Sequence, residues 1–416
     1  MSQRLQAPRG TFDVLPEDAA RRDVLAATAR TTLGRAGYGR VDTPVFEATE
    51  LFARGVGEAT DIVQKEMFTF DDGGGRSVTL RPEGTAPVTR AYFENGMTRL
   101  PQPVRLWYLG PFFRRERAQA GRFRQFTQVG AEAIGSDDPT LDAELIILLA
   151  DLLDAVGVRQ VSLRIGSLGS ATTRAEYREE LKRFLRAHEA ELSEEVRARI
   201  DLNPLRAFDA DHPGTRRVMA GAPTLLDRLA PEDRAHFDEV LARLDDAGQP
   251  YEIDTALVRG LDYYTRTLFE FTSDRLGAQS AVGGGGRYDG LAEQLGGPHT
   301  PGVGWAAGIE RMLLAAEPPA PAPPVVDLFV ALAQPEAGRA GFRIAQEARR
   351  AGLGAQVEAA GRSLKGQLKH ADRLGARYVA IVGATAEIGL KEMESGEQRD
   401  VSADTVVAAV LRGPRL

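Results

Sequence analysis

The sequence of 416 residues contains no cysteine, which excludes disulfide bonds and zinc sites built on thiolates. Histidine is scarce as well, and the spacing of its five residues is not typical of metal ligands, so the sequence identifies no metal site. No apolar run approaches the ~18 residues that a membrane-spanning helix needs. The opening segment MSQRLQAPRG lacks the apolar core of a secretion signal. We therefore expect a cytoplasmic protein without a membrane partner.

Charge is unevenly distributed along the chain. The formal net charge is −7, yet the segment 99–124 contains seven arginines and a single acidic residue, Glu116. A cluster of like charges repels itself and therefore usually has an anionic partner. On charge alone, a solvated basic face remains the alternative.

A proline-rich run and changes in the hydrophobic periodicity along the chain predict several domains. A helix is predicted over 17–36 and another over 141–156, with short alternating runs typical of strands between them. The segment 171–247 is charged and mostly helical in pattern. The run EPPAPAPP (317–324) predicts a stiff linker. Beyond it, strand and helix patterns alternate, which predicts a small domain around a largely parallel sheet.

One predicted strand carries polar side chains suited to a small ligand. In the strand RQFTQVGAE, alternate side chains face the same side, so Phe126, Gln128, Gly130 and Glu132 share one face. Glycine leaves open space above a sheet. This face therefore suits a small polar ligand, and a half-exposed strand with ordinary polar residues is the alternative.

The segment TLRPEGTA (79–86) has a similar design if it is a strand. Arg81, Glu83 and Thr85 would then share a face, and the Glu83 carboxylate could bind an ammonium group with Thr85 as a second acceptor. The alternative is that PEGT forms a capped turn that leads into a helix over 86–95.

Two further segments combine glycine with polar or aromatic side chains. In LVRGLDYYTRTLFEF, Arg259, Tyr263 and Tyr264 flank a Gly-Leu-Asp turn. The segment AVGGGGRYDGL (281–291) is dense in glycine but is not a Walker loop, because no Gly-Lys-Ser/Thr follows. At the start of a predicted helix, Arg311 offers a guanidinium group to an anion, with an ordinary surface arginine as the alternative.

Together these motifs resemble those of class II histidyl-tRNA synthetases over essentially the whole chain. The segments PRGTFDVLPED, TPVFE and TLRPEGTA are similar to the family's N-terminal and dimer-interface segments. GPFFRRERAQAGRFRQFTQ resembles class II motif 2, and GVGWAAGIERMLL resembles motif 3. LVRGLDYY and GGGRYDGL resemble the two histidine-specific peptides, which distinguish this family from other class II synthetases.

The resemblance implies an α+β protein that forms a homodimer. Its class II catalytic domain would be built on a six-stranded antiparallel sheet and interrupted by a helical insertion, and a C-terminal α/β domain would bind the anticodon. The implied boundaries are 1–169 and 251–316 for the two parts of the catalytic domain, 170–250 for the insertion, 317–324 for the Pro-rich linker and 325–416 for the anticodon-binding domain.

The implied reaction has two steps. L-histidine attacks the α-phosphate of ATP, accompanied by Mg²⁺, to give histidyl-adenylate and pyrophosphate. The histidyl group then passes to the terminal adenosine of histidine tRNA. The substrate carboxylate is itself the nucleophile, so the protein mainly positions the reactants and neutralises charge.

By resemblance, the ATP site lies in motifs 2 and 3. Arg114 would hold the α-phosphate, Arg122 the triphosphate, and Phe126 would stack on adenine. Glu116 would also belong to this site, and Arg311 resembles the motif 3 arginine that pairs with a phosphate. These roles account for the cluster of positive charge.

The resemblance also implies the groups that recognise histidine. Glu83, Thr85 and Gln128 would hold the α-amino group. Glu132 and Tyr264 would hold the imidazole ring, because a neutral imidazole needs one donor and one acceptor partner.

Two arginines are implied as catalytic residues. Arg259 would contact the substrate carboxylate and the α-phosphate, where charge develops in the transition state. Arg114 would contact both histidine and ATP, and Tyr263 would line the histidine pocket.

Contacts with tRNA are implied in two regions. Arg117, Gln119 and Arg124 of the motif 2 loop would meet the acceptor end. On a predicted helix over 362–374, Lys365 and Lys369 share a basic face that is suited to phosphates. A solvated face is the alternative there.

One other functional class fits the same catalytic fold. A regulatory subunit of ATP phosphoribosyltransferase, a histidine-sensing paralogue, shares the fold without aminoacylation. Such paralogues lack the C-terminal domain and do not keep the histidine-specific peptides intact. This chain contains both features, which favours the synthetase.

Overall fold

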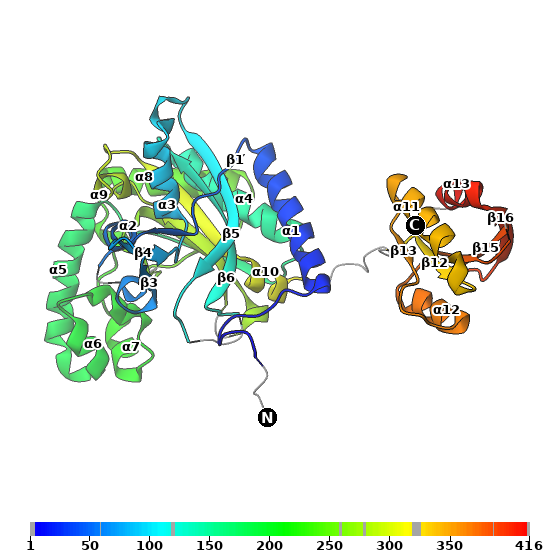
Figure 1. Cartoon of the computed structure of the whole chain (residues 1–416). Helices are drawn as coiled ribbons and strands as arrows, with labels where there is room; N and C mark the ends of the chain where they lie inside the picture. Colours follow the sequence, from blue (N-terminus) through cyan, green and yellow to red (C-terminus); the bar gives the residue numbers. More distant parts are fainter. Residues whose placement is uncertain are drawn as a thin grey trace. The chain divides into compact units, whose positions relative to one another are not determined.

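The computed structural model describes residues 5–58, 60–117, 121–257, 260–277, 280–317, 326–385 and 387–413. The chain divides into two compact units, Met1–Pro318 and Pro319–Leu416 (Figure 1). Nearly all of the expected Pro-rich linker lies outside the described residues. Among the residues described, no helix has the length and apolar character needed to cross a membrane.

The first unit is built on an eight-stranded sheet with the order β1-β5-β6-β11-β10-β9-β7-β8. Its six central strands pair antiparallel throughout, which confirms the expected six-stranded sheet. A two-residue strand adds in parallel at each edge. The bounds are β1 Gly39–Arg40, β5 Val104–Phe113, β6 Gln125–Ile134, β7 Val161–Ser167, β8 Glu252–Ile253, β9 Thr265–Ser273, β10 Ala281–Arg287 and β11 Gly302–Gly308.

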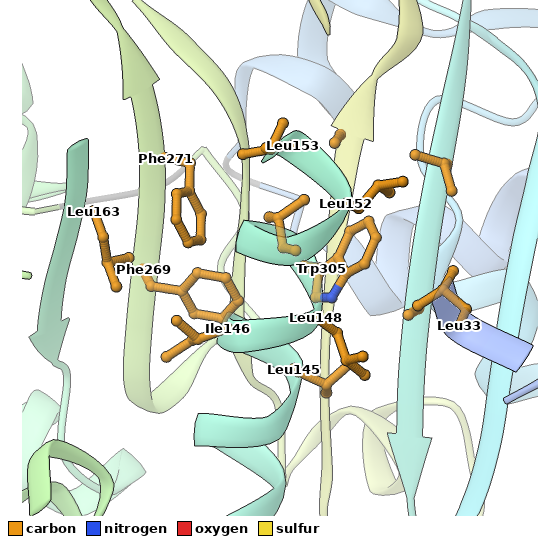
Figure 2. Packing of buried hydrophobic residues seen from close by; sticks show 14 of the residues in the cluster. Leu33, Leu145, Ile146, Leu148, Leu152, Leu153, Leu163, Phe269, Phe271 and Trp305 are labelled. Carbon is orange, nitrogen blue, oxygen red and sulfur yellow. The ribbon is translucent and has the colours of Figure 1, made fainter. Parts of the chain in front are cut away.

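One face of this sheet packs against α4 (Pro139–Ala155), a leucine-rich helix whose Asp138 cap accepts the backbone N–H of Thr140. Figure 2 shows leucines of α4 beside Trp305, Phe269 and Phe271 of the sheet. The odd-numbered β6 residues, Val129 to Ala133, belong to this core. The even-numbered residues therefore face the opposite side of the sheet, as alternation predicts. Helices α1 (Pro16–Arg35) and α10 (Ile309–Ala315) also contribute to this core.

The first unit also contains a small antiparallel sheet of three strands. Their order is β2 (Phe46–Ala48), β4 (Ser77–Leu80), β3 (Phe68–Asp71). Strand β4 ends at Leu80, and helix α3 (Thr85–Glu94) begins four residues after Arg81. The expectation that Arg81, Glu83 and Thr85 share a strand face is therefore wrong, and the alternative of a turn into a helix is right. Pro82 cannot donate to a strand ladder, which favours the end of β4 here.

Helices α5, α6 and α7 follow β7 and precede β8 in the sequence, and they gather at one flank of the unit (Figure 1). They pack around their own apolar cluster, which includes Tyr177, Leu181 and Val196. Helix α8 differs, because its Phe237 and Val240 join the main core. The inserted helices are α5 Ala171–Ala187, α6 Glu194–Arg199, α7 Pro213–Met219 and α8 Pro231–Asp246.

Shorter helices complete the first unit. They are α2 Thr49–Val56, α9 Leu291–Gln294, the π-helix η1 Ile62–Glu66, and the 3-10 helices η2 Met97–Arg99, η3 Glu189–Glu191, η4 Pro204–Asp209, η5 Leu226–Arg228 and η6 Asp274–Leu276.

The second unit has a mixed five-stranded sheet in the order β13-β12-β14-β15-β16. The first three strands are parallel, whereas β15 and β16 form an antiparallel hairpin, so the sheet is less parallel than expected. Helices cover both faces in separate apolar clusters. The bounds are β12 Leu328–Leu332, η7 Pro335–Ala337, α11 Gly338–Arg350, β13 Ala355–Val357, α12 Leu364–Arg373, β14 Tyr378–Val382, β15 Glu387–Glu392, β16 Gln398–Ser402, η8 Ala403–Thr405 and α13 Val406–Arg412.

Candidate active site

A cavity of about 460 Å³ opens on the side of the large sheet that the even-numbered residues of β6 face, opposite the main core. Its lining brings together six residues singled out in the sequence: Arg114, Glu116, Arg122, Phe126, Gln128 and Arg311. They come from the loop after β5, from β6 and from the first turn of α10. Segments nearly 200 residues apart in the chain therefore build one wall.

Two of the arginines in the cavity contact the same carboxylate, that of Glu116. Glu116 lies between two guanidinium groups, 3.7 Å from Nη1 of Arg114 and 3.3 Å from Nη1 of Arg122. Arg114 also donates from Nε to the carbonyl of Pro82 at 2.9 Å, and its guanidinium carbon lies 5.4 Å from the centre of the Phe126 ring. These contacts place two cations on either side of one carboxylate, and guanidinium groups suit the oxygens of a phosphate.

Arg311 is placed by its neighbour in sequence. Glu310 is buried and accepts from the backbone N–H of Thr127 at 3.0 Å and from Nη2 of Arg22 at 3.0 Å. This carboxylate joins the first turn of α10 to β6 and α1. The adjacent Arg311 side chain is thereby brought to the cavity wall.

A buried polar cluster lies on the same sheet face as Gln128, deeper along β6. The Glu132 carboxyl is fully buried and accepts hydroxyl groups from Tyr288 (2.7 Å), Thr85 (2.9 Å) and Tyr108 (3.3 Å). Burial raises the pKa of Glu132 to about 8, although these three hydroxyl donors each lower it. The carboxyl therefore changes its proton occupancy near neutral pH.

Glu83 is the second buried carboxyl of the cluster. It accepts the backbone N–H groups of Thr85 (2.8 Å) and Ala86 (3.0 Å) and so caps the start of α3. The hydroxyl of Tyr263 lies 3.4 Å from it. Burial raises the pKa of Glu83, whereas the two backbone N–H groups and the nearby Arg114 lower it.

Tyrosine rings fill the remainder of this cluster. The rings of Tyr263 and Tyr264 are 4.7 Å apart, and Tyr288 lies 5.9 Å from Tyr263. All three side chains are buried. The Tyr264 backbone carbonyl accepts a hydrogen bond from Arg174 of α5, which brings the helical insertion into contact with this segment.

The role expected for Gly130 is wrong. Its missing side chain makes room for the ring of Tyr108, which pairs with it across β5 and β6, and not for a ligand. Gly304 and Gly302 act similarly, because side chains there would overlap Glu132 and Tyr288. The dense glycines of this region therefore allow buried polar and aromatic side chains to approach the sheet.

Sequence reasoning missed Tyr108 and Tyr288 as members of the site. Tyr288 lies inside the quoted peptide GGGRYDGL, but nothing in that peptide indicates that its hydroxyl reaches Glu132. Tyr108 could have been found from the strand pairing, which places it opposite Gly130.

Gln128 connects the cavity and the buried cluster. Its amide oxygen is buried and has no hydrogen-bond partner among the residues that the structure describes. An unpaired buried acceptor costs about 1–3 kcal/mol. Gln128 also lines the cavity.

The remaining predicted residues are only partly placed. Arg259 and Gln119 lie outside the described residues. Arg117 is exposed, whereas Arg124 is half-buried against Gly10, whose carbonyl accepts the Arg124 backbone N–H at 2.7 Å.

On α12, Lys365 and Lys369 are both exposed. Within the described ranges, no group of three or more His, Asp or Glu side chains is arranged to hold a metal ion.

Comparisons with known proteins agree over both units. A family profile described as histidyl-tRNA synthetase matches residues 10–312, and one described as anticodon binding domain matches residues 327–412. A histidine–tRNA ligase of Rubrobacter xylanophilus is 48% identical over 408 residues, with 95% of this chain and 96% of the relative covered. One of Rhodococcus erythropolis is 49% identical over 412 residues, with 96% of each chain covered.

Solved structures show the same likeness. The structure of apo histidyl-tRNA synthetase from S. aureus superposes with a TM-score of 0.81 at 36% identity, covering 98% of this chain and 100% of that one. A protein from Bacillus halodurans, described as an ATP phosphoribosyltransferase regulatory subunit/histidyl-tRNA synthetase, is 22% identical with a TM-score of 0.67, over 93% of this chain and 100% of that one, and shows the fold alone. On the profile match and the full-length relatives, this chain belongs to the histidyl-tRNA synthetase family.

Proposed function

We propose that the histidine–tRNA ligase activity of this chain resides in the cavity and in the buried cluster beside it. The observation that carries this assignment is Gln128, which lines the cavity and shares the strand face that leads to Glu132. Its buried amide oxygen has no hydrogen-bond partner among the described residues. ATP would occupy the open cavity, and the histidine side chain would point toward the buried cluster. The reacting groups would meet at Arg114, which is close to both.

The cavity supports the ATP assignment. Arg114 and Arg122 flank Glu116 and would exchange this carboxylate for phosphate oxygens. Phe126 offers an aromatic face to adenine, and Arg311 adds a third cation to the lining. Glu116 would then orient the two arginines before ATP binds.

Mg²⁺ would enter with ATP and neutralise phosphate charge. The cavity lining supplies carboxylates at Glu66, Glu116 and Glu270, and Mg²⁺ is commonly bound by one or two carboxylates together with substrate phosphates. Burial, followed by the neighbouring Glu116, raises the pKa of Glu66.

The buried cluster supports the histidine assignment. The α-amino group would donate to Gln128, Glu83 and the Thr85 oxygen, whose own proton points to Glu132. The imidazole ring would lie between Glu132 and Tyr264. Because Glu132 has a pKa of about 8, it can accept from or donate to a ring nitrogen near neutral pH.

The chemistry then follows from positioning. The histidine carboxylate attacks the α-phosphorus, and pyrophosphate leaves. Arg114 stabilises the charge on the α-phosphate oxygens, and Arg259 is proposed to do so together with it. No side chain becomes covalently attached. Transfer of the histidyl group to the terminal adenosine of histidine tRNA releases AMP.

We also propose which surfaces contact tRNA and a second copy of the chain. The second unit, with the exposed Lys365 and Lys369, would contact the anticodon arm, and the motif 2 loop would contact the acceptor end. A homodimer is supported by Phe46 and Phe70, two exposed aromatic side chains on the two outer strands of the small sheet, whose ring centres are 6.3 Å apart. We propose that the protein acts in the cytoplasm, where tRNA, histidine and ATP would be its substrates.

The regulatory-subunit alternative is less supported. The second unit is present and folded, and the full-length relatives above are named as histidine–tRNA ligases. Pyrophosphate exchange measured with each of the twenty amino acids separates the two functions. We expect exchange with histidine alone, whereas a folded protein that binds ATP and shows no exchange would favour the regulatory function.

A further inference from the structure

The turn that carries Tyr264 is held from two sides. On one side, the backbone N–H of Asp262 donates to the carbonyl of Val56 at 3.1 Å, and the absent side chain of Gly57 leaves room for Asp262. On the other side, Arg174 of α5 donates from Nη1 to the Tyr264 carbonyl at 2.7 Å. The catalytic unit therefore fixes one side of the turn, and the helical insertion binds the other.

Helix α5 is itself fixed at its first turn. The fully buried Asp233 of α8 accepts the backbone N–H of Ser170, the N-cap of α5, at 2.7 Å. The same carboxylate accepts Nε of Arg266 at 2.9 Å, and Arg266 lies two residues after Tyr264. One buried carboxylate thus joins α5, α8 and β9 one turn before Arg174. The Arg174 guanidinium is consequently held in a defined place relative to β9.

We propose that Arg174 is a positioning residue for histidine recognition, which rests on the histidine site proposed above. By binding the Tyr264 carbonyl, Arg174 fixes the point from which the Tyr264 side chain enters the buried cluster. The ring is buried and packs against Tyr263 at 4.7 Å, so a displacement of its backbone would change where its hydroxyl lies. The hydrogen bond from Arg174 thereby connects the helical insertion to the residue proposed to hold the imidazole ring.

The placement of Arg174 predicts a selective effect. The residues proposed for ATP lie on β6, α10 and the loop after β5, and Arg174 donates to a different segment. Loss of its hydrogen bond should therefore weaken histidine binding and leave ATP binding intact. A brace that only stabilises the fold would instead weaken both substrates together.

The test measures KM for histidine and for ATP in pyrophosphate exchange, with the melting temperature of each variant. Arg174→Met keeps much of the side-chain volume and removes the donor, and Arg174→Lys keeps a donor. Arg178→Met is the matched control, because Arg178 is one turn later on α5 and donates to a carbonyl inside the insertion, that of Leu202, at 2.8 Å. Tyr264→Phe tests the histidine site itself.

We expect Arg174→Met to raise KM for histidine about tenfold, which corresponds to about 1.4 kcal/mol. KM for ATP should stay within about twofold, Arg174→Lys should show a smaller rise, and Arg178→Met should match the unaltered protein. If Arg174→Met does not fold, Arg174→Lys decides by the same comparison of the two KM values. Unchanged histidine KM, or equal rises for both substrates, would overturn the proposal.

The Tyr264 variant separates two kinds of failure. If Tyr264→Phe raises histidine KM and Arg174→Met does not, only the positioning role is wrong. If neither variant changes histidine KM, the proposed histidine site is wrong and the positioning role falls with it.

Discussion

The hydroxyl of Tyr288 donates to the carboxyl of Glu132 at 2.7 Å, although 156 positions separate them in the chain. This bond joins β6 to the segment GGGRYDGL. Thr85, at the start of α3, donates to the same carboxyl at 2.9 Å. Three segments thus meet at one fully buried group, and its environment should govern both stability and recognition.

The raised pKa of Glu132 predicts a pH dependence of stability. The carboxyl has an ordinary pKa of 4.5 when unfolded and about 8 in the fold, so the folded state binds the proton more tightly. Its contribution to stability is present below the unfolded pKa and is lost as pH rises through about 8. Glu132→Gln cannot release this proton. Between roughly pH 5.5 and 8.5, its melting temperature should therefore fall less than that of the unaltered protein; parallel profiles would contradict this.

Gln128 should contribute to function at the expense of stability. Its buried oxygen lacks a partner among the described residues, so replacing it with an apolar side chain of similar size removes an unsatisfied group. We expect Gln128→Met to keep or raise the melting temperature and to lower kcat/KM for histidine about tenfold or more, the effect of one lost hydrogen bond to a charged group. A lower melting temperature with unchanged kcat/KM would show that Gln128 is structural.

Alternation along one strand predicted much of the site. It placed Phe126, Gln128 and Glu132 on a common face, and the structure confirms that arrangement because Val129 and Ala131 enter the main core on the other side. Such a prediction succeeds because side chains of a strand alternate whatever the tertiary context. The substrate roles of these residues stay predictions.

Other features depend on contacts that the sequence does not encode locally. The carboxyl of Glu83 caps α3 because β4 ends at Leu80, and Pro82 was the available signal for that boundary. The space above Gly130 is filled by Tyr108, which only the strand register reveals. The sequence did not predict the β15–β16 hairpin, because both strands contain charged residues and most positions of β16 are exposed.

Arg259 lies outside the described residues, so its role is predicted from the sequence. If it stabilises charge at the α-phosphate, Arg259→Ala should slow adenylation by ~10²–10³ and alter histidine binding far less. Single-turnover formation of histidyl-adenylate measures this directly. A decrease below about tenfold would be too small for the proposed role.

The two compact units predict a separation of the two reaction steps. Removal of residues 319–416 should leave the catalytic unit with substantial histidine-dependent pyrophosphate exchange, because the cavity and the buried cluster lie wholly within the first unit. Charging of tRNA should fall strongly, since anticodon contacts would be lost. Exchange and charging assays on the same truncated preparation, beside the full chain, provide the comparison. Undiminished tRNA affinity and charging would refute the assignment of the second unit.

The central claim is that Glu132 recognises the imidazole ring while the cavity binds ATP. Its most direct test is to measure the affinities for histidine and for ATP in purified Glu132→Gln, which keeps the shape of the side chain and replaces its carboxyl by an amide. We predict that histidine binds at least about tenfold more weakly, whereas ATP affinity changes less than twofold. Equal losses for the two substrates, or no loss for histidine, would contradict the account.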